Sequence, residues 1–299
     1  MRSSILETIG TPMVEVDAPA GTTVAAKVES FNPSGSAKMR PALNMIREAD
    51  PDPDTVFVEA TSGNTGVGLA CATAALGYEF VVVMPEGRLD HNRRLMAAYG
   101  ADVRVVEPPY SNAKRVAREY AAESDDRYYL AQSENPDNPA AHYQTTAEEI
   151  LRQVGDRVPD AMVAGTATGG TLCGTGRRLR EEWPDLDLVA VEPAVNPWLS
   201  DEGNNGDDYK GMGGKDLVGN IDMELIDRVE SVAYEDAVAE CRRLAREEGI
   251  LVGETSGASN RAAREEAERL RDEEGVDEPF VLTVYWDSGE RYLDVGFLT

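Results

Sequence analysis

The stretch TVFVEATSGNTGVGLACATAALGYEFVVVM, residues 55–84, decides the fold because it holds a helical pattern between two strand patterns. Its short ends, 55–60 and 79–84, are apolar and rich in Val, which is typical of buried strands. The segment between them, 64–77, is rich in Ala and long enough for a helix. A strand, a helix and a second strand in this order predict two parallel neighbours joined by a crossover helix.

The same alternation continues along the chain. Further strands are predicted at 102–107, 128–132, 161–166, 187–193, 249–254 and 279–286. Further helices are predicted at 91–100, 112–124, 171–183, 234–248 and 259–274. The predicted fold class is therefore α/β, with mainly parallel twisted sheets covered by helices on both faces. The Pro- and Asn-rich stretch 134–140 marks a candidate junction between two domains, and 196–222 is expected to be a long functional loop.

The composition has an extreme charge. The 299 residues include 55 Asp and Glu against 29 Lys and Arg, which gives a formal net charge of −26. This excludes nonspecific binding to nucleic acids or anionic membranes, because both need clustered basic side chains. Only five of the basic residues are Lys. We therefore expect a halophilic protein whose charge repulsion is screened by a salt-rich cytosol; the alternative is an acidic protein kept soluble by its charge.

The Cys and His residues predict no metal site, and the lack of a signal-peptide pattern or a long apolar run predicts a cytoplasmic protein. Cys71, Cys173 and Cys241 form no C-x-x-C pair, so neither a disulfide framework nor a zinc site is expected. The first ten residues lack the apolar core of a signal peptide, and no run reaches 18 apolar residues. We expect His91 to lie at the surface and His142 to be a hydrogen-bonding residue at a helix start.

The turn NPSGSAK (32–38) ends in a lysine with an unusual position. Pro41 suits the first turn of a helix, which places Lys38 at the helix N-terminus. The positive end of the helix dipole lowers the pKa of a lysine there and favours the free amine that forms an imine with an aldehyde. A solvated lysine in a capping loop is the alternative, but a chain that otherwise uses Arg has kept a lysine here. The other four lysines lie in less suggestive positions: Lys27, Lys114, Lys210 and Lys215.

Three further strand-to-helix turns are rich in Gly and hydroxyl groups. TSGNTG (61–66) offers more donors than a helix cap needs, which suits a carboxylate. ATGGT (167–171) places two glycines where backbone N–H groups can surround a phosphate, although a tight turn alone would also explain it. GETSGA (253–258) is a weaker case of the same pattern. A lysine, a carboxylate site and a phosphate site together predict pyridoxal 5′-phosphate acting on an amino acid.

These turns belong to a longer series of motifs: TIGTPMV (8–14), NPSGSAK (32–38), TSGNTG (61–66), MPEGR (84–88), NPDNPAAHYQTT (135–146), TGGT (168–171), EEGILVG (247–253), TSGA (255–258) and SGERYL (288–293). In this order the series resembles the cysteine synthase and cystathionine β-synthase family of pyridoxal-phosphate enzymes, fold type II, over nearly the whole chain. The resemblance implies a smaller, mobile N-terminal domain, 35–145, and a larger phosphate-binding domain made of 1–34 and 146–299. It also implies a homodimer.

The resemblance implies a role for each candidate site residue. Lys38 would be the catalytic residue, forming the internal aldimine and later moving the proton at the substrate Cα. Asn64 would hydrogen-bond the 3′ oxygen of the cofactor, and Thr255 would face its ring nitrogen. The cofactor phosphate would be bound by Thr168, Gly169, Gly170 and Thr171. The substrate carboxylate would be bound by Thr61, Ser62, Thr65 and Gln132.

The implied reaction is β-replacement on an activated L-serine, with O-acetyl-L-serine as the expected substrate. Loss of the β-substituent would give an aminoacrylate, and sulfide or another thiol would add to it, sulfide giving L-cysteine. Condensation of serine with homocysteine, serine/threonine dehydration and a cofactor-binding homologue without turnover remain open alternatives. The chain departs from the residues usual in the family at Met39, Ser133 and Ala167, and in the loop 210–219.

Overall fold

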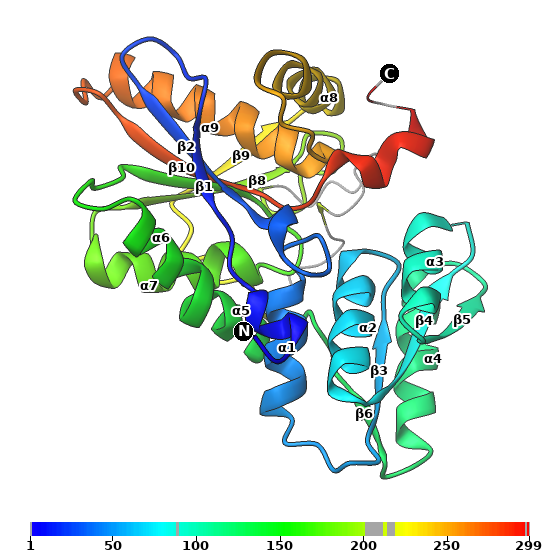
Figure 1. The fold of residues 1–299 in the computed structure, drawn as a ribbon. Coiled ribbons are helices and arrows are strands. Elements are labelled where there is room, and N and C mark those ends of the chain that lie inside the picture. The colour runs from blue at the N-terminus through cyan, green and yellow to red at the C-terminus, as the bar shows by residue number, and fades with distance from the viewer. Residues whose placement is uncertain (1, 88–89, 201–211, 214–218, 297, 299) are drawn as a thin grey trace.

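The strands of the computed structural model form two separate sheets, with helices on both faces of each (Figure 1). The structure describes residues 2–87, 90–200, 212–213, 219–296 and 298. Strands that end at the same edge of a parallel sheet bring their following turns together, so the two sheets fix where the predicted turns can meet.

The larger sheet has six strands in the order β1-β2-β10-β7-β8-β9. Only the edge strand β1 runs antiparallel, against β2, and the other four pairings are parallel. The strands span β1 Met13–Val16, β2 Thr23–Val28, β7 Ala161–Gly165, β8 Asp187–Pro193, β9 Arg228–Val232 and β10 Phe280–Tyr285.

The smaller sheet has four strands in the order β5-β4-β3-β6, and all of its pairings are parallel. Its strands span β3 Val56–Ala60, β4 Glu79–Pro85, β5 Asp102–Val106 and β6 Arg127–Tyr129. β3, α2 and β4 form the strand–helix–strand unit that residues 55–84 predict, with β3 and β4 as parallel neighbours.

Both faces of each sheet are buried, which explains why the strands are apolar at nearly every position. Along β7, Ala161 and Val163 pack on one face with side chains of α8 and α9, while Met162 and Ala164 pack on the other with side chains of α6 and α7. The smaller sheet is similar: one face packs against α1 and α2 and the other against α4.

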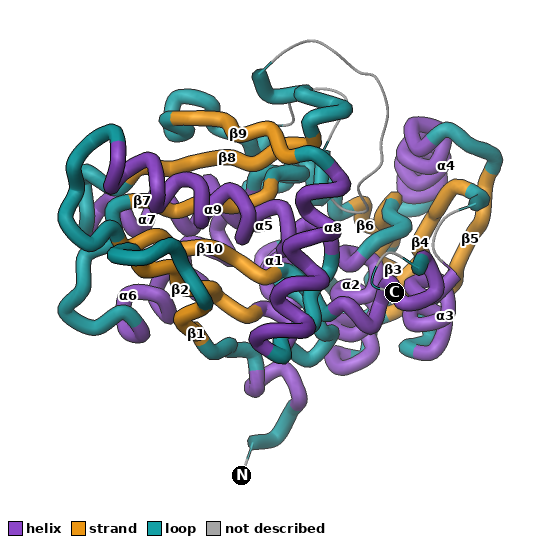
Figure 2. Tube along the Cα trace, turned by 90° about the horizontal axis from the view of Figure 1, so that it is seen from above, coloured by secondary structure: helices purple, strands orange, loops and turns teal. Residues whose placement is uncertain are grey.

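Helix α1 lies between the two halves of the molecule. It packs against α2 on one side and α5 on the other, and the view from above places it between the two sheets (Figure 2). The helices span α1 Met39–Glu48, α2 Asn64–Leu76, α3 Asp90–Ala98, α4 Tyr110–Ala122, α5 Asp137–Ala141, α6 Glu148–Gln153, α7 Gly170–Glu182, α8 Tyr234–Arg243 and α9 Glu254–Asp272. No helix within the described ranges is long and apolar enough to cross a membrane.

The predicted elements are confirmed apart from three segments. The strand predicted at 128–132 ends at Tyr129, and Ala131 adopts a positive φ of 53°. The strand predicted at 249–254 is wrong: Gly249 adopts a positive φ of 71° after a π-helical turn, Leu244–Glu248, and Val252 makes only an isolated bridge to Ser288. The helix predicted at 259–274 begins five residues earlier, at Glu254. Gly257 allows this, because a Cβ there would collide with the Ala237 carbonyl and the Cys241 thiol of α8.

The structure also contains elements that the sequence patterns did not predict. The strands β1 and β9 and the helices α5 and α6 are short, between four and six residues each. The second half of the Pro- and Asn-rich stretch 134–140 forms most of α5. Most of the predicted loop 196–222 lies outside the described residues, as do Lys210 and Lys215.

Candidate active site

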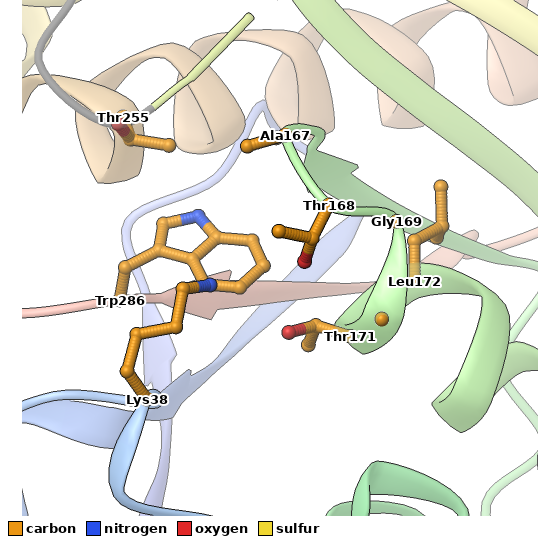
Figure 3. A pocket seen from close by; sticks show the side chains of 10 residues that line it. Lys38, Ala167, Thr168, Gly169, Thr171, Leu172, Thr255 and Trp286 are labelled. Atoms are coloured by element: carbon orange, nitrogen blue, oxygen red, sulfur yellow. The ribbon is translucent and has the colours of Figure 1, made fainter. Parts of the chain in front are cut away.

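A pocket lies at the carboxyl ends of β7 and β10, where ligands bind in parallel α/β sheets. Figure 3 shows Lys38, Thr168, Thr171 and Thr255 around it, with the indole of Trp286 beside the end of the Lys38 side chain. Four segments that are distant in sequence therefore meet at this point. The lining residues are Lys38, Gly165, Ala167, Thr168, Gly169, Gly170, Thr171, Leu172, Thr255 and Trp286.

Lys38 occupies the N-cap of α1, as the sequence predicts, because α1 begins at Met39. Burial lowers the pKa of Lys38 to about 8, although the charges of Asp287 and Glu29 favour its protonated form. The lowered pKa agrees with the expectation, and burial is its largest cause. The amine nitrogen lies 5.0 Å from the centroid of the Trp286 ring. A lysine in this environment has a larger fraction of free amine near neutral pH than an exposed one.

The close approach of α2 fixes the backbone at Lys38. A Cβ on Gly68 would lie 2.8 Å from the Lys38 carbonyl oxygen, nearer than real Cβ atoms come. Glycine at this position of α2 therefore lets the TSGNTG turn at the start of the helix lie beside the lysine.

The turn at the start of α7 has the form of a phosphate site. Gly169 is its N-cap with a φ of +78°, a conformation that favours glycine, and the helix begins at Gly170. Backbone N–H groups at a helix start have no partner within the helix and bind anions. The hydroxyls of Thr168 and Thr171 line the same pocket.

Two residues outside the predicted set hold these threonines. Asn138 Nδ2 donates to Thr168 Oγ1 at 3.2 Å and to the Gln132 carbonyl at 2.7 Å, so it links the phosphate turn to Gln132. His142 Nε2 lies 3.1 Å from Thr171 Oγ1, and its Nδ1 lies 2.9 Å from Thr146 Oγ1.

His142 acts through hydrogen bonds, as the sequence predicts, but its location differs from the prediction. It is fully buried in a π-helical turn, His142–Ala147, that follows α5. Burial lowers its pKa well below the usual value, and the charges of Lys38 and Arg40 add to the effect. His142 is therefore neutral. Both Asn138 and His142 lie in the motif NPDNPAAHYQTT, which was the signal that could have found them.

The predicted carboxylate site forms a connected group on the smaller sheet. Thr65 Oγ1 donates to Gln132 Oε1 at 2.6 Å, which joins the start of α2 to the segment after β6. The Gln132 N–H donates to the buried Glu59 carboxylate at 3.0 Å, and Thr61 Oγ1 accepts the Gly63 N–H at 3.3 Å.

The rest of this turn is held by its backbone and by Asn64. The Ser62 carbonyl accepts from Asn92 Nδ2 at 3.2 Å, and Asn64 Nδ2 donates to Asp287 at 2.5 Å. In the described part of the chain these predicted residues do not line the pocket at Lys38: Thr61, Ser62, Asn64, Thr65 and Gln132. Asn138 connects Gln132 to the pocket residue Thr168 by hydrogen bonds, and Asp287, next to the pocket residue Trp286, accepts a hydrogen bond from Asn64.

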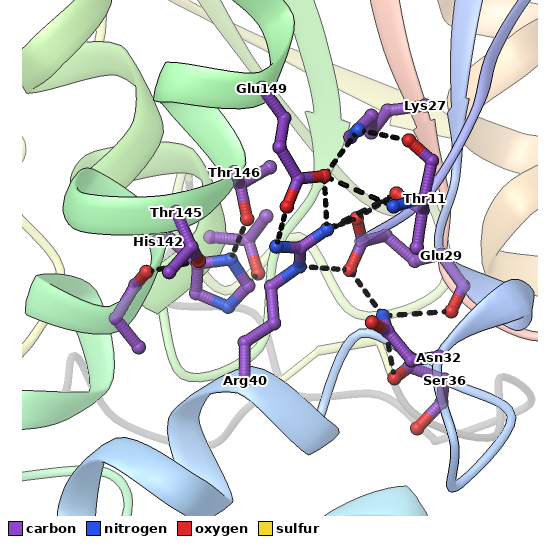
Figure 4. A network of polar contacts seen from close by, with 12 residues as sticks. Thr11, Lys27, Glu29, Asn32, Ser36, Arg40, His142, Thr145, Thr146 and Glu149 are labelled. Atoms are coloured by element: carbon purple, nitrogen blue, oxygen red, sulfur yellow. Dashed lines mark hydrogen bonds and ion pairs between the residues drawn. The ribbon is translucent and has the colours of Figure 1, made fainter. Parts of the chain in front are cut away.

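A buried network of charges lies behind the Lys38 turn (Figure 4). Arg40 donates to Glu29 at 2.7 and 2.8 Å and to Glu149 at 2.7 and 2.8 Å, and Lys27 donates to Glu149 at 2.6 Å. Two cations and two carboxylates balance each other, as buried charges require. The network joins β2, the start of α1 and α6. It therefore fixes the position of the first turn of α1, which Lys38 caps.

The chemistry of the pocket fits pyridoxal 5′-phosphate. The Lys38 amine can form an imine with an aldehyde, and the start of α7 offers N–H and hydroxyl donors to a phosphate. Thr255 lines the same pocket and carries a hydroxyl that could serve a ring nitrogen. A lysine and a phosphate site facing one pocket define the class of protein as an enzyme that uses this cofactor.

Comparison with known proteins gives the family. The chain belongs to the pyridoxal-phosphate dependent enzyme family, whose model matches residues 5–282. It is 40% identical over 295 residues to a cysteine synthase of Staphylococcus aureus, covering 95% of this chain and 93% of that protein.

Solved structures agree with the fold. O-acetylserine sulfhydrylase isoform 3 of Entamoeba histolytica has a TM-score of 0.92 at 31% identity, covering 99% of this chain and 91% of that one. An O-acetylserine dependent cystathionine β-synthase of Helicobacter pylori has a TM-score of 0.89 at 33% identity, covering 100% and 99%. The fold is that of the fold type II enzymes.

Proposed function

We propose that this enzyme makes L-cysteine from an activated L-serine, O-acetyl-L-serine, and sulfide. The observation that carries the proposal is the single pocket shared by Lys38, the phosphate turn and Thr255, in a chain 40% identical to a cysteine synthase. In the reaction the bond from Cβ to the acetate oxygen breaks and acetate leaves. A carbon–sulfur bond then forms with hydrosulfide, and the proton removed from Cα returns to it.

Six of the ten residues that line the pocket have a defined task in this proposal. Lys38 would hold the cofactor covalently, and its amine would remove the Cα proton of the substrate and return it. Thr168, Gly169, Gly170 and Thr171 hold the phosphate. Thr255 would face the ring nitrogen, and a neutral hydroxyl there would not hold that nitrogen protonated. When bound, the cofactor supplies the electron sink that makes the Cα proton removable.

The carboxylate of the substrate is bound by the start of α2 and by Gln132. Thr61, Ser62 and Thr65 supply hydroxyls, and the helix start supplies N–H donors to a negative charge. All of these residues lie within 35–145, the unit that we propose to be the smaller, mobile domain. The location of all four strands of the smaller sheet within the same range supports this division.

We also propose that the enzyme is a cytoplasmic homodimer. Cys71, Cys173 and Cys241 are buried free thiols, which suits a reducing compartment. The homodimer rests on the resemblance to the cysteine synthase family.

The second candidate is condensation of serine or O-acetylserine with homocysteine, because the H. pylori protein of similar fold is a cystathionine β-synthase that depends on O-acetylserine. Dehydration, in which no nucleophile adds, is the third. The products separate the three reactions. We expect the cofactor-loaded enzyme with O-acetylserine to form cysteine and acetate in a sulfide-dependent manner, as measured by mass spectrometry. Two results would contradict the assignment of sulfide as the nucleophile. One is cystathionine formed from homocysteine faster than cysteine forms from sulfide, and the other is pyruvate formed without any thiol faster than cysteine forms.

A further inference from the structure

The segment after β10, residues 286–293, contains a motif that the proposed function leaves without a role, SGERYL. The segment holds two of the turns that form the pocket. The Ala37 N–H donates to the Trp286 carbonyl at 2.9 Å, and Ser36 forms a bridge with Asp287, directly before Lys38. The Trp286 N–H donates to Ser256 Oγ at 2.9 Å, next to Thr255.

The segment also fixes the amide of Asn64. Arg291 Nη1 donates to Asn64 Oδ1 at 3.1 Å, and Asn64 Nδ2 donates to Asp287 Oδ2 at 2.5 Å. A guanidinium group only donates, so the amide oxygen must face Arg291 and the amide nitrogen must face the carboxylate. The opposite orientation would set two donors against each other. Nδ2 carries two hydrogens, and among the described residues only Asp287 accepts from it.

Asp287 and Arg291 are themselves firmly held. Asp287 is 3% exposed, and the Tyr292 hydroxyl donates to the same carboxylate oxygen at 2.6 Å. Arg291 also donates to the Ser34 carbonyl. Its guanidinium lies against Gly35, whose φ of +74° and lack of a Cβ leave the space that the guanidinium occupies. Neither partner of the Asn64 amide is therefore free to rotate away.

We propose that Asp287 and Arg291 are positioning residues that present the second N–H of Asn64 to the 3′ oxygen of the cofactor. The inference rests on the proposed function and on the role that the family resemblance implies for Asn64, a hydrogen bond to that oxygen. An N–H donor favours the ionised form of a phenolic oxygen, whereas an amide oxygen turned toward it would repel it. Asp287 and Arg291 thereby act on cofactor binding through Asn64 without touching the cofactor.

A double-mutant cycle on cofactor binding tests this proposal. Cofactor-free protein is titrated with pyridoxal phosphate, and the dissociation constant and the visible absorption of the bound form are measured. Asp287→Ala and Asn64→Ala should each weaken binding about tenfold and shift the absorption. Because Asp287 acts through Asn64, the double variant should bind no more than about twofold more weakly than Asn64→Ala alone.

Two further variants separate positioning from general damage. In Asp287→Asn the amide oxygen can still accept from Asn64 and Tyr292, so binding should return to within about threefold of the wild type. Glu290→Gln, an exposed change in the same segment, is the matched control and should bind as the wild type does. Thermal melting of each cofactor-free variant confirms that it is folded.

The outcomes are distinct. Normal binding and absorption in Asp287→Ala would overturn the proposal, as would losses that multiply in the double variant. Either result leaves wild-type binding and cysteine formation intact. A wild-type protein that binds no pyridoxal phosphate would instead overturn the proposed function.

Discussion

The free amine of Lys38 controls how the cofactor is loaded. Its pKa is lowered to about 8, chiefly by burial. Only the free amine attacks an aldehyde, and its fraction rises with pH up to the pKa. The rate constant for loading pyridoxal phosphate should therefore rise about tenfold per pH unit below pH 8 and level off above it. Stopped-flow absorbance measures this rate. A rate that keeps rising to about pH 10, as for an ordinary lysine, would contradict the lowered pKa.

At the scale of single residues, the sequence predicted the groups that face the pocket better than those that hold them. Lys38, the threonines of the α7 turn and Thr255 lie in turns whose Gly and hydroxyl content exceeds what a cap requires. Asn138 and Asp287 reach the site only through tertiary contacts. The motif NPDNPAAHYQTT marks Asn138, but it does not report which residue Asn138 contacts, because the partner Thr168 lies 30 residues away; Asn64, the partner of Asp287, lies 223 residues away.

At the scale of elements, the buried charge network holds β2, α1 and α6 together. Burial alone would raise the pKa of Glu149, but the hydrogen bonds and charges of Arg40 and Lys27 lower it to about 2. Glu149→Gln should cost about 3 kcal/mol of unfolding free energy, because two buried cations would share one carboxylate. Denaturant unfolding at neutral pH measures this cost.

The neighbouring Glu148 supplies a matched control for that prediction. It lies on the same helix and pairs with Arg178, but its side chain is 41% exposed. Glu148→Gln should therefore cost less than about 1 kcal/mol. A carboxylate with a lowered pKa stabilises the fold above its unfolded pKa, so the difference between wild type and Glu149→Gln should shrink as the pH falls from about 4.5 to about 2. Equal losses of unfolding free energy in Glu149→Gln and Glu148→Gln would contradict a stabilising role of the buried charge network.

Sequence periodicity located the buried strands, but it misplaced the start of α9 and predicted a strand just before it for physical reasons. A buried strand such as β4 gives a continuous apolar run. The start of α9 is rich in Thr, Ser and Gly, which are poor helix formers, and forms a helix because these small residues pack tightly against α8. The apolar run before it, 250–252, is held by loop hydrogen bonds and one bridge instead of a strand ladder.

At the scale of the whole molecule, the net charge of −26 predicts a dependence on salt. Repulsion among exposed carboxylates opposes folding at low ionic strength and is screened within about 3 Å at 1 M salt. We expect the melting temperature to rise by about 5 °C or more between 0.1 M and 2 M potassium chloride, and activity to rise with it. Calorimetry in the two buffers measures the shift. A melting temperature that is highest at low salt would contradict a halophilic protein.

The central claim is that Lys38 is the residue that binds the cofactor, and one measurement tests it directly. Protein loaded with pyridoxal phosphate is reduced with borohydride, which makes the carbon–nitrogen bond permanent, and is then digested and mapped by mass spectrometry. We expect a pyridoxyl group on Lys38 alone among the five lysines, and no visible absorption band in Lys38→Ala. A pyridoxyl group on Lys27 or Lys114, or on no lysine, would contradict it.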